Sequence, residues 1–493
     1  MHKNTDRLST GSQPFISQPS IFLLPNELLL HVAGFLSEDR DIASLLQANQ
    51  RLKYLLENYI FQNNLATNYG TALPLCAKYG LRKSVQKILS LGADGDESDI
   101  DSRTASSYAA EKGDFEMWQI LLDHDALLGH EQNLFNKGDD NERTPLSWAA
   151  EGDQLEFAQY LIKHGVNVDT TCSERRTPLS YAAEAGHLAM VQWLLEQGTS
   201  PEDSICLEDR DGLTPLHYAA FEGNECIVEL LISSGAHPDH EGMDCMYMAA
   251  QTPVMEAARG GQLTVVKMLL DMGADVERCD VRGMSPLTYA ARAGVGEPLR
   301  ESDYYLVNFM HGQPGPGWYF DGAGFQAPCK SGKLRDYLAV VKLLIDRGAD
   351  PRKSHCDHNG LPEDSPLYCA AWAGATDIVE FLIDAGAEVD DLSTKRDRTA
   401  LHAAVRNGHL DVVERLLAHG ANVNARDPMH TPLDRAKFAA KLVAQGKGSF
   451  EYGDIWNTRY MVLFKDNLMK YQQVVDMLIA HGGEVGVESF SPW

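Results

Sequence analysis

Histidines, cysteines and carboxylates are the residues of this sequence that could catalyse a reaction or bind a metal, and their spacing favours neither activity. His217 and His402 each stand three residues after a threonine, where we expect the imidazole to hydrogen-bond a neighbouring loop rather than act as a base. Residues 355–358 (His-Cys-Asp-His) lack a second ligand pair at zinc spacing, so we interpret them as a connecting loop. The Gly-rich stretch 312–324 contains no phosphate-binding motif. No nucleophile, base and acid can be assigned as a set, so the sequence predicts a protein that is not an enzyme and uses no metal or cofactor.

A sequence motif recurs along most of the chain, and it predicts the helices and loops that carry these residues. The copies Thr177–Gly186, Thr214–Gly223 and Thr399–Gly408 share a first Thr, a Leu two residues later, small residues in the middle and a final Gly. Thr caps a helix, and Gly supplies a left-handed residue that turns the chain into a second helix. Each copy therefore predicts a helix-turn-helix unit, called a repeat below, and a residue's place is its distance in sequence from the first residue of its repeat. Repeats one to ten begin at Thr71, Thr104, Thr144, Thr177, Thr214, Thr252, Ser285, Ser365, Thr399 and Thr431.

This repeat resembles the ankyrin repeat, whose period is about 33 residues. The resemblance covers residues 71–484 and recurs in register, which makes it specific. It implies an all-α solenoid of about ten helix-turn-helix units joined by short β-hairpin loops. Because one unit cannot bury its apolar face alone, the units must stack, and solenoids of this kind bind other proteins.

Some repeats depart from the pattern. Asp125 replaces the Gly that ends the second helix of repeat two, so we expect an irregular repeat followed by a loop over residues 127–140. Two insertions, near 295–336 and 441–470, separate the first helix from the second helix in repeats seven and ten. Ala440 replaces the turn Gly in repeat ten, so the sequence predicts that this first helix continues beyond it.

The segment 21–65 differs from the repeats, because its apolar residues recur at the three- and four-residue spacing of short amphipathic helices. It resembles an F-box, a match that spans about forty residues, and this order of F-box and ankyrin repeats resembles that of many fungal proteins. The resemblance implies docking on the adaptor subunit of a cullin–RING ubiquitin ligase. The alternative is a helical cap that covers the end of the solenoid. We expect residues 1–20 to be disordered and residues 485–493 to form a tail. The residues that would dock on the adaptor subunit are Leu24, Pro25, Leu28, Leu45 and Leu46.

The resemblance to ankyrin repeats implies that place seven faces a concave, partner-binding surface. Along the stack these residues change from acidic, through an aromatic residue, to basic, which suggests a dipolar partner whose acidic part lies over repeats six to nine. Trp and Arg often anchor interfaces, although ordinary solvated charges are an equal alternative. The loop Trp318–Phe320 is a second candidate contact, unless its rings fold back on the solenoid. The place-seven residues are Glu111, Glu151, Glu184, Phe221, Arg259, Arg292, Trp372 and Arg406, and the hairpins add Arg176, Arg210, Arg282 and Arg398.

Composition narrows the possible partners and compartments. The 493 residues carry a formal net charge of −27, which disfavours nucleic acid and anionic membranes. No apolar stretch approaches the ~20 residues of a membrane helix, so we expect a cytoplasmic or nuclear protein. The sequence therefore favours a substrate-recognition adaptor of a cullin–RING ubiquitin ligase, whose repeats bind an unidentified target protein. The alternative is an ankyrin scaffold with no link to a ligase.

Overall fold

The computed structural model describes most of the chain after residue 71, and its secondary structure is helical apart from an isolated β-bridge between Ser98 and Thr104. The all-α expectation is therefore confirmed for these residues. They belong to two compact units, Met1–Pro145 (unit 1) and Leu146–Trp493 (unit 2). The described residues are 72–99, 101–128, 133–198, 204–240, 251–281, 283–293, 336–352, 364–391, 398–427, 430–444 and 458–485.

Unit 1 holds repeats one and two as two packed helix pairs. The first helices α4 and α6 pack against each other, as do the second helices α5 and α7. Leu73, Val85 and Trp118 are among the residues that this packing buries. The helices of unit 1 are α4 (Ala72–Lys78), α5 (Arg82–Ser90), α6 (Ala105–Glu111), α7 (Phe115–Leu128) and α8 (Asn133–Asn136), and α9 (Pro145–Glu151) begins at the boundary.

The loop predicted over residues 127–140 is partly wrong. Helix α7 continues through Asp125 to Leu128, and the short α8 follows. Asp adopts the left-handed conformation that ends a helix less readily than Gly, so the substitution prolongs the helix instead of ending it. Phe135 of α8 then packs edge-on against Trp118, with ring centroids 5.8 Å apart, and this burial stabilises the short helix.

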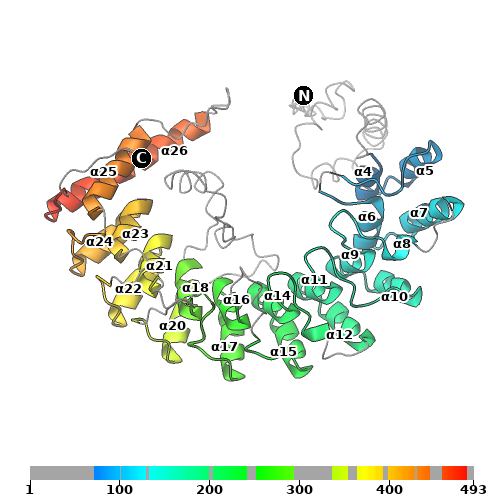
Figure 1. The fold of residues 1–493 in the computed structure, drawn as a ribbon, viewed down its shortest axis with the longest axis horizontal. Helices are drawn as coiled ribbons and strands as arrows, with labels where there is room; N and C mark the ends of the chain where they lie inside the picture. Colours follow the sequence, from blue (N-terminus) through cyan, green and yellow to red (C-terminus); the bar gives the residue numbers. More distant parts are fainter. Residues whose placement is uncertain are drawn as a thin grey trace, which may run out of the picture. The chain divides into compact units, whose positions relative to one another are not determined.

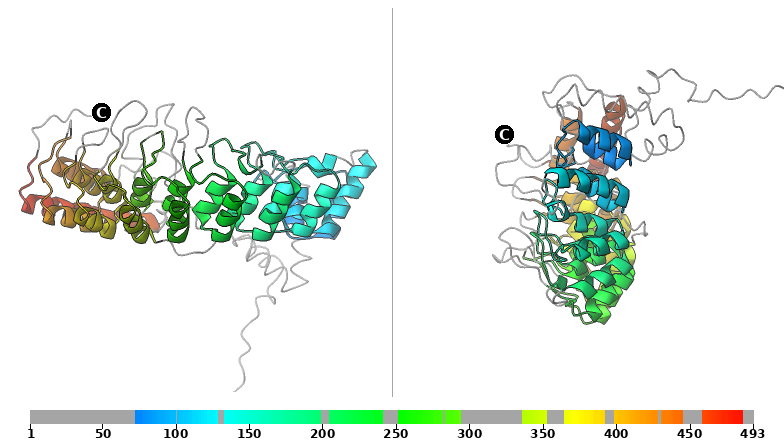
Figure 2. Two further views of the ribbon diagram at one scale, coloured as in Figure 1. Left: turned by 90° about the horizontal axis from the view of Figure 1, so that it is seen from below. Right: turned by 90° about the vertical axis from the view of Figure 1, so that its right-hand side faces the viewer.

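Unit 2 continues the same scheme as two rows of helices (Figure 1). From repeat four onward, each first helix packs against the first helix of the next repeat, and each second helix packs against the next second helix. The described loops between repeats lie along one side of these rows (Figure 2). The helices are α10 (Leu155–Lys163), α11 (Pro178–Ala185), α12 (Leu188–Gln197), α14 (Pro215–Glu222), α15 (Glu225–Ser233), α16 (Pro253–Arg259), α17 (Leu263–Asp271), α18 (Pro286–Ala293), α20 (Tyr337–Asp346), α21 (Pro366–Ala373), α22 (Thr376–Asp384), α23 (Ala400–Asn407), α24 (Leu410–Ala418), α25 (Pro432–Ala444) and α26 (Thr458–Ala480).

The capping chemistry of the sequence explains why the first helices begin and end where they do. In α11 the Thr177 hydroxyl accepts the Ser180 N–H at 3.2 Å, and the Ser180 hydroxyl oxygen accepts the Thr177 N–H at 3.0 Å. Such a capping box stabilises a helix by about 1 kcal/mol. Gly186 ends the helix with φ +83°, a left-handed conformation that strains other residues.

The loop before each first helix is held by an aspartate in several repeats. One oxygen of Asp209 accepts the N–H groups of Asp211 and Leu213 at 2.9 and 2.8 Å, and the other accepts the Tyr218 hydroxyl. Burial raises the pKa of Tyr218 well above its ordinary value, which keeps this hydroxyl a neutral donor. The same carboxylate–tyrosine bond joins Asp99 to Tyr108 (2.7 Å) and Asp280 to Tyr289 (2.8 Å).

Polar side chains at place ten join consecutive repeats. Asn224 donates to the Ala183 carbonyl at 2.8 Å, and Gln262 donates to the Phe221 carbonyl at 3.0 Å. Both acceptors lie at the end of the preceding first helix, where carbonyls have no partner within the helix. These bonds therefore fix the spacing of the first-helix row.

The two repeats that contain insertions still form helix pairs. In repeat seven, α20 packs against α18, so the segment after the insertion supplies the second helix. In repeat ten, α26 packs against α25, and Tyr471 of α26 donates to the Arg406 carbonyl at 2.8 Å, replacing the place-ten side chain. Helix α25 runs to Ala444, which confirms that the substitution at Ala440 prolongs it.

Candidate partner-binding surface

The predicted contact residues lie near the C-terminal end of each first helix. All of them are half-buried, whereas the two residues before each are buried. Place seven is therefore where the first helix turns from the core to solvent. Their role in binding stays a prediction. They are Glu111 on α6 in unit 1, Glu151 on α9, Glu184 on α11, Phe221 on α14, Arg259 on α16, Arg292 on α18, Trp372 on α21 and Arg406 on α23.

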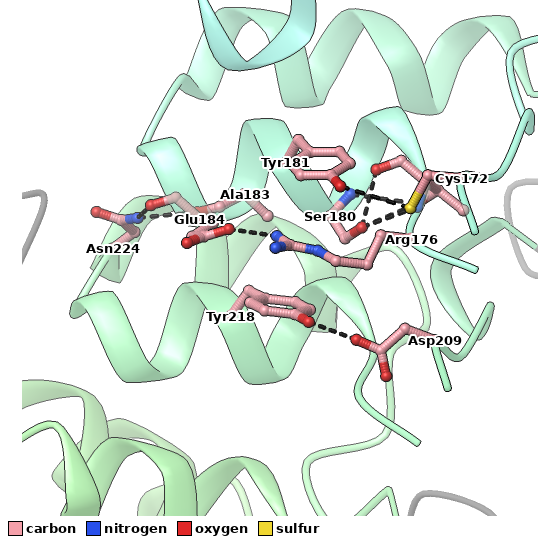
Figure 3. A network of polar contacts seen from close by, with 10 residues as sticks. Cys172, Arg176, Ser180, Tyr181, Ala183, Glu184, Asp209, Tyr218 and Asn224 are labelled. Carbon is pink, nitrogen blue, oxygen red and sulfur yellow. Dashed lines mark hydrogen bonds and ion pairs between the residues drawn. The ribbon is translucent and has the colours of Figure 1, made fainter. Parts of the chain in front are cut away.

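Arg176, the residue just before repeat four, lies at the centre of a polar cluster on this surface (Figure 3). Its guanidinium carbon is 4.1 Å from the ring centroid of Tyr181 and 4.0 Å from that of Tyr218, and it forms an ion pair with Glu184. Tyr218 belongs to the next repeat, so one arginine joins two repeats. Burial alone would lower the pKa of Arg176, but Tyr218 and Glu184 raise it above its ordinary value, so the guanidinium stays charged.

Unit 1 contains the same arrangement in repeat two. Arg103, which precedes that repeat, forms an ion pair with Glu111, and its guanidinium carbon is 3.9 Å from the ring centroid of Tyr108. In both repeats an arginine from the loop thus neutralises the acidic residue at place seven, eight residues later. The acidic place-seven residues of repeats two and four are therefore locally balanced by charge.

In the middle of unit 2 the surface is built from an aromatic residue and a cation. The guanidinium carbon of Arg259 is 4.4 Å from the ring centroid of Phe221, the place-seven residue of the preceding repeat. Arg259 also donates through Nε to a carboxylate oxygen of Glu256 at 3.1 Å. The side chain of Glu256 is 2% exposed, so this ion pair is largely shielded from solvent.

Repeats eight to ten place several cations together. Arg406 lies over the ring of Trp372, with 5.3 Å between the guanidinium carbon and the ring centroid. Arg398, just before repeat nine, lies 3.4 Å from a carboxylate oxygen of Asp427. Arg435 donates to that same oxygen through Nε at 2.8 Å. This part of the surface therefore differs from repeats two and four, where one arginine meets one glutamate.

Sequence reasoning missed the loop arginines as partners of the place-seven residues, although a signal was present. We name the residue just before each repeat its lead residue. In three successive repeats an arginine at the lead position is followed eight residues later by glutamate: Arg103 and Glu111, Arg143 and Glu151, Arg176 and Glu184. The spacing exceeds two helical turns, so helix periodicity alone gave no reason to pair them.

Several predicted residues lie outside the described part of the chain. These are the F-box-like residues Leu24, Pro25, Leu28, Leu45 and Leu46, the loop Trp318–Phe320, Arg282, and residues 355–358. Arg210 is described, and its side chain is 60% exposed at 3.9 Å from Glu174.

The two histidines considered for catalysis are buried parts of helix caps. Nδ1 of His217 accepts the N–H of Thr214 at 3.1 Å, and its Nε2 bonds the Gln251 carbonyl of the next repeat at 2.9 Å. His402 makes the same contact with Thr399, at 3.3 Å. Burial lowers the pKa of His217 to about 3 and that of His402 to about 4, so both are neutral at pH 7.

The described residues bring together no group of three or more His, Cys, Asp or Glu side chains suited to a metal ion. Among the described helices, none combines the length and apolarity needed to cross a membrane.

Family models for ankyrin repeats match this chain over more than half its length. The model for three repeat copies matches residues 73–172, 108–205, 167–242 and 331–427, and the model for many copies matches 254–296. The chain therefore belongs to the ankyrin-repeat family. Ankyrin repeats bind protein partners, so protein–protein interaction is the class of function that the fold defines.

Individual relatives share the repeats but not the rest of their length. Alpha-latrocrustotoxin-Lt1a of Latrodectus tredecimguttatus is 34% identical over 122 residues, 24% of this chain and 8% of the relative. The ankyrin repeat and KH domain-containing protein mask-1 of Caenorhabditis elegans is 30% identical over 202 residues, 35% of this chain and 7% of the relative. Human palmitoyltransferase ZDHHC13 is 40% identical over 81 residues, 16% of this chain and 12% of the relative. The alignments span only a small part of each of these relatives.

Proposed function

We propose that this protein is an adaptor that binds a target protein through the first-helix face of its ankyrin repeats and delivers it to a ubiquitin ligase. The half-buried place-seven residues, which recur on one row of helices in unit 2, carry the first part of the proposal. They combine aromatic and guanidinium groups, such as Phe221 with Arg259 and Trp372 with Arg406. These are the residue types that contribute most to protein interfaces.

The ligase link rests on the order of apolar residues in segment 21–65. Leu24, Pro25 and Leu28 would form the first adaptor-binding helix, and Leu45 with Leu46 the next. The adaptor would act by proximity. Because it binds both the target protein and the ligase, it raises the effective concentration of target lysines near the ligase. Delivery of the target protein to the ligase would take place in the cytoplasm or nucleus.

A pull-down with the cullin adaptor subunit tests the ligase link. The full-length chain should retain the adaptor, and the double substitution Leu24→Asp plus Leu28→Asp should abolish retention. Leu91→Asp is the matched control, because Leu91 is 61% exposed in unit 1 and lies outside segment 21–65. It should leave binding unchanged.

If the full-length chain fails to bind the adaptor while its circular dichroism spectrum remains helical, the ligase link is wrong. The protein would then be a scaffold whose first helices only cap the solenoid. Affinity purification with mass spectrometry under proteasome inhibition would identify the target protein in either case.

A further inference from the structure

The lead residue and the place-seven residue of a repeat lie in contact in repeats two, four and seven, so the repeats can be compared at these two positions. In repeats two and four the two positions form ion pairs, Arg103 with Glu111 and Arg176 with Glu184. In repeat seven they are also in contact, with Nη1 of Arg292 at 3.7 Å from the sulfur of Met284. The pairs of repeats two to ten, in chain order, are Arg103/Glu111, Arg143/Glu151, Arg176/Glu184, Leu213/Phe221, Gln251/Arg259, Met284/Arg292, Asp364/Trp372, Arg398/Arg406 and His430/Phe438.

Repeat nine departs from this scheme, because both positions are arginine. Arg398 takes the position of Arg176, and Arg406 takes the position of Glu184. The tyrosine that stacks on the arginine in repeat four, Tyr181, is replaced by Ala403. Two like charges therefore occupy positions that form an ion pair in repeats two and four.

A third arginine lies close to this pair of like charges. Arg398 and Arg435 both lie against Asp427, whose side chain is 1% exposed. Burial and then the charge of Arg398 hold the pKa of Arg435 below its ordinary value. Burial and the charge of Asp364 raise the pKa of the Tyr368 hydroxyl, whereas Arg398 and Arg406 lower it. Arg435 also interacts electrostatically with Tyr368, so three guanidinium groups lie around this hydroxyl in a chain whose net charge is −27.

Apolar side chains lie on both sides of Arg406 in the first-helix row. Trp372 is the place-seven residue of repeat eight, and Phe438, which is 48% exposed, is that of repeat ten. Helices α21, α23 and α25 that carry these residues pack in succession. The place-seven residues of repeats eight, nine and ten are therefore an aromatic residue, a cation and an aromatic residue.

We propose that the first-helix face of repeats eight to ten binds an acidic segment of a protein partner, with a partner carboxylate placed between Arg398 and Arg406 as Glu184 is placed beside Arg176. Apolar residues on either side of this acid pack against Trp372 and Phe438. Packed helices lie about 8–10 Å apart and an extended chain advances about 3.3 Å per residue, so the apolar residues stand about three positions from the acid. This inference rests on the proposed protein-binding role and names the chemistry of the partner.

Selection of peptides from a random phage-displayed library on the full-length chain tests this inference. We expect the enriched peptides to contain Asp or Glu with apolar residues about three positions away on each side. Binding of the best synthetic peptide, followed by fluorescence anisotropy, should weaken at least tenfold in Arg406→Glu. It should also weaken as salt is raised, because the contact is between charges.

Arg406→Glu is informative because it reproduces the arginine–glutamate pair of repeats two and four. The variant should fold, with a Tm no lower than that of the natural chain. Arg415→Glu is the matched control, since Arg415 lies on the second helix of the same repeat, 51% exposed. This change should alter peptide affinity by less than twofold.

A selection without acidic enrichment would overturn the inference, as would acidic peptides that bind Arg406→Glu as tightly as the natural chain. Failure of the ligase link is distinguishable from either result. Leu24→Asp plus Leu28→Asp tests adaptor binding by segment 21–65 and leaves the peptide site unchanged.

Discussion

At the scale of single residues, some side chains that we expect to contact a partner also make contacts within the chain. Arg176 and Glu184 are 18% and 16% exposed at their side chains, and the guanidinium is enclosed by Tyr181 and Tyr218. An arginine in this position contributes packing, a cation–π contact and an ion pair at the same time. The pair therefore stabilises the junction of repeats four and five, whatever else it binds.

Arg176→Met should lower the free energy of unfolding by about 2 kcal/mol, because it leaves the largely buried Glu184 carboxylate without its cation. Urea unfolding followed by circular dichroism measures the loss. Arg176→Lys keeps the charge but not the planar stack, and should lose less.

The double substitution Arg176→Met plus Glu184→Gln checks the cause. It should cost clearly less than the sum of the two single substitutions, because the unpaired carboxylate is then removed. Strict additivity would show that the two side chains do not stabilise each other.

At the scale of one element, two of the first helices, α14 and α23, begin at caps that contain a neutral histidine. His217 joins the start of α14 to the next repeat, and His402 caps α23. A protonated ring could not accept the threonine N–H, so protonation and capping exclude each other.

Acidification should therefore weaken these caps. The pKa of His217 is about 3 in the folded protein and about 6.5 when unfolded, so the unfolded chain binds the proton more tightly. The stabilisation is complete above pH 6.5 and is lost as pH falls from 6.5 towards 3. At pH 5 the loss is about 2 kcal/mol for His217, and His402 behaves similarly.

Thermal unfolding at pH 7 and pH 5 tests this expectation. His217→Gln should show a smaller fall in Tm between the two pH values than the natural chain. His419→Gln is the control, because His419 is exposed on its loop and should leave the fall unchanged. An equal fall in all three proteins would contradict the role of His217.

At the scale of the whole molecule, stability in each unit is built from contacts between neighbours. In unit 2, α15 packs against α14, α12 and α17, and its Val228 and Leu231 are fully buried. Such a stack lacks a single core, so a substitution that destabilises one repeat destabilises the adjacent repeats before more distant ones.

Leu231→Ala should destabilise repeat five by about 2–5 kcal/mol, because it leaves a cavity between packed helices. Hydrogen–deuterium exchange should accelerate in α14, α15 and the helices beside them, while α24 keeps its protection. Leu263→Ala is the control, since that side chain is 38% exposed on α17. Uniform acceleration along unit 2 would instead indicate a single cooperative core.

The sequence by itself determined the helix pairs and the register of the repeats, because capping and turning are local. Thr177 caps its own helix three residues away, and the left-handed residue at Gly186 ends it whatever lies beyond. Even the extended first helix of repeat ten followed from one substitution, Ala440. The loop predicted over residues 127–140 was partly wrong, and the helix α8 within it was missed because burial of Phe135 against Trp118 is a tertiary contact that periodicity does not reveal.

Only the tertiary structure decided which charges neutralise one another. The sequence predicts that the acidic residues Glu111 and Glu184 face a partner. In the structure each forms an ion pair with the loop arginine eight residues earlier. That contact depends on the hairpin geometry and on the stacking of the next repeat, as with Tyr218 against Arg176. The interactions that begin and end a helix are made by residues close together in sequence. The ion pairs and ring contacts of this surface form between segments that only the stacking of repeats brings together.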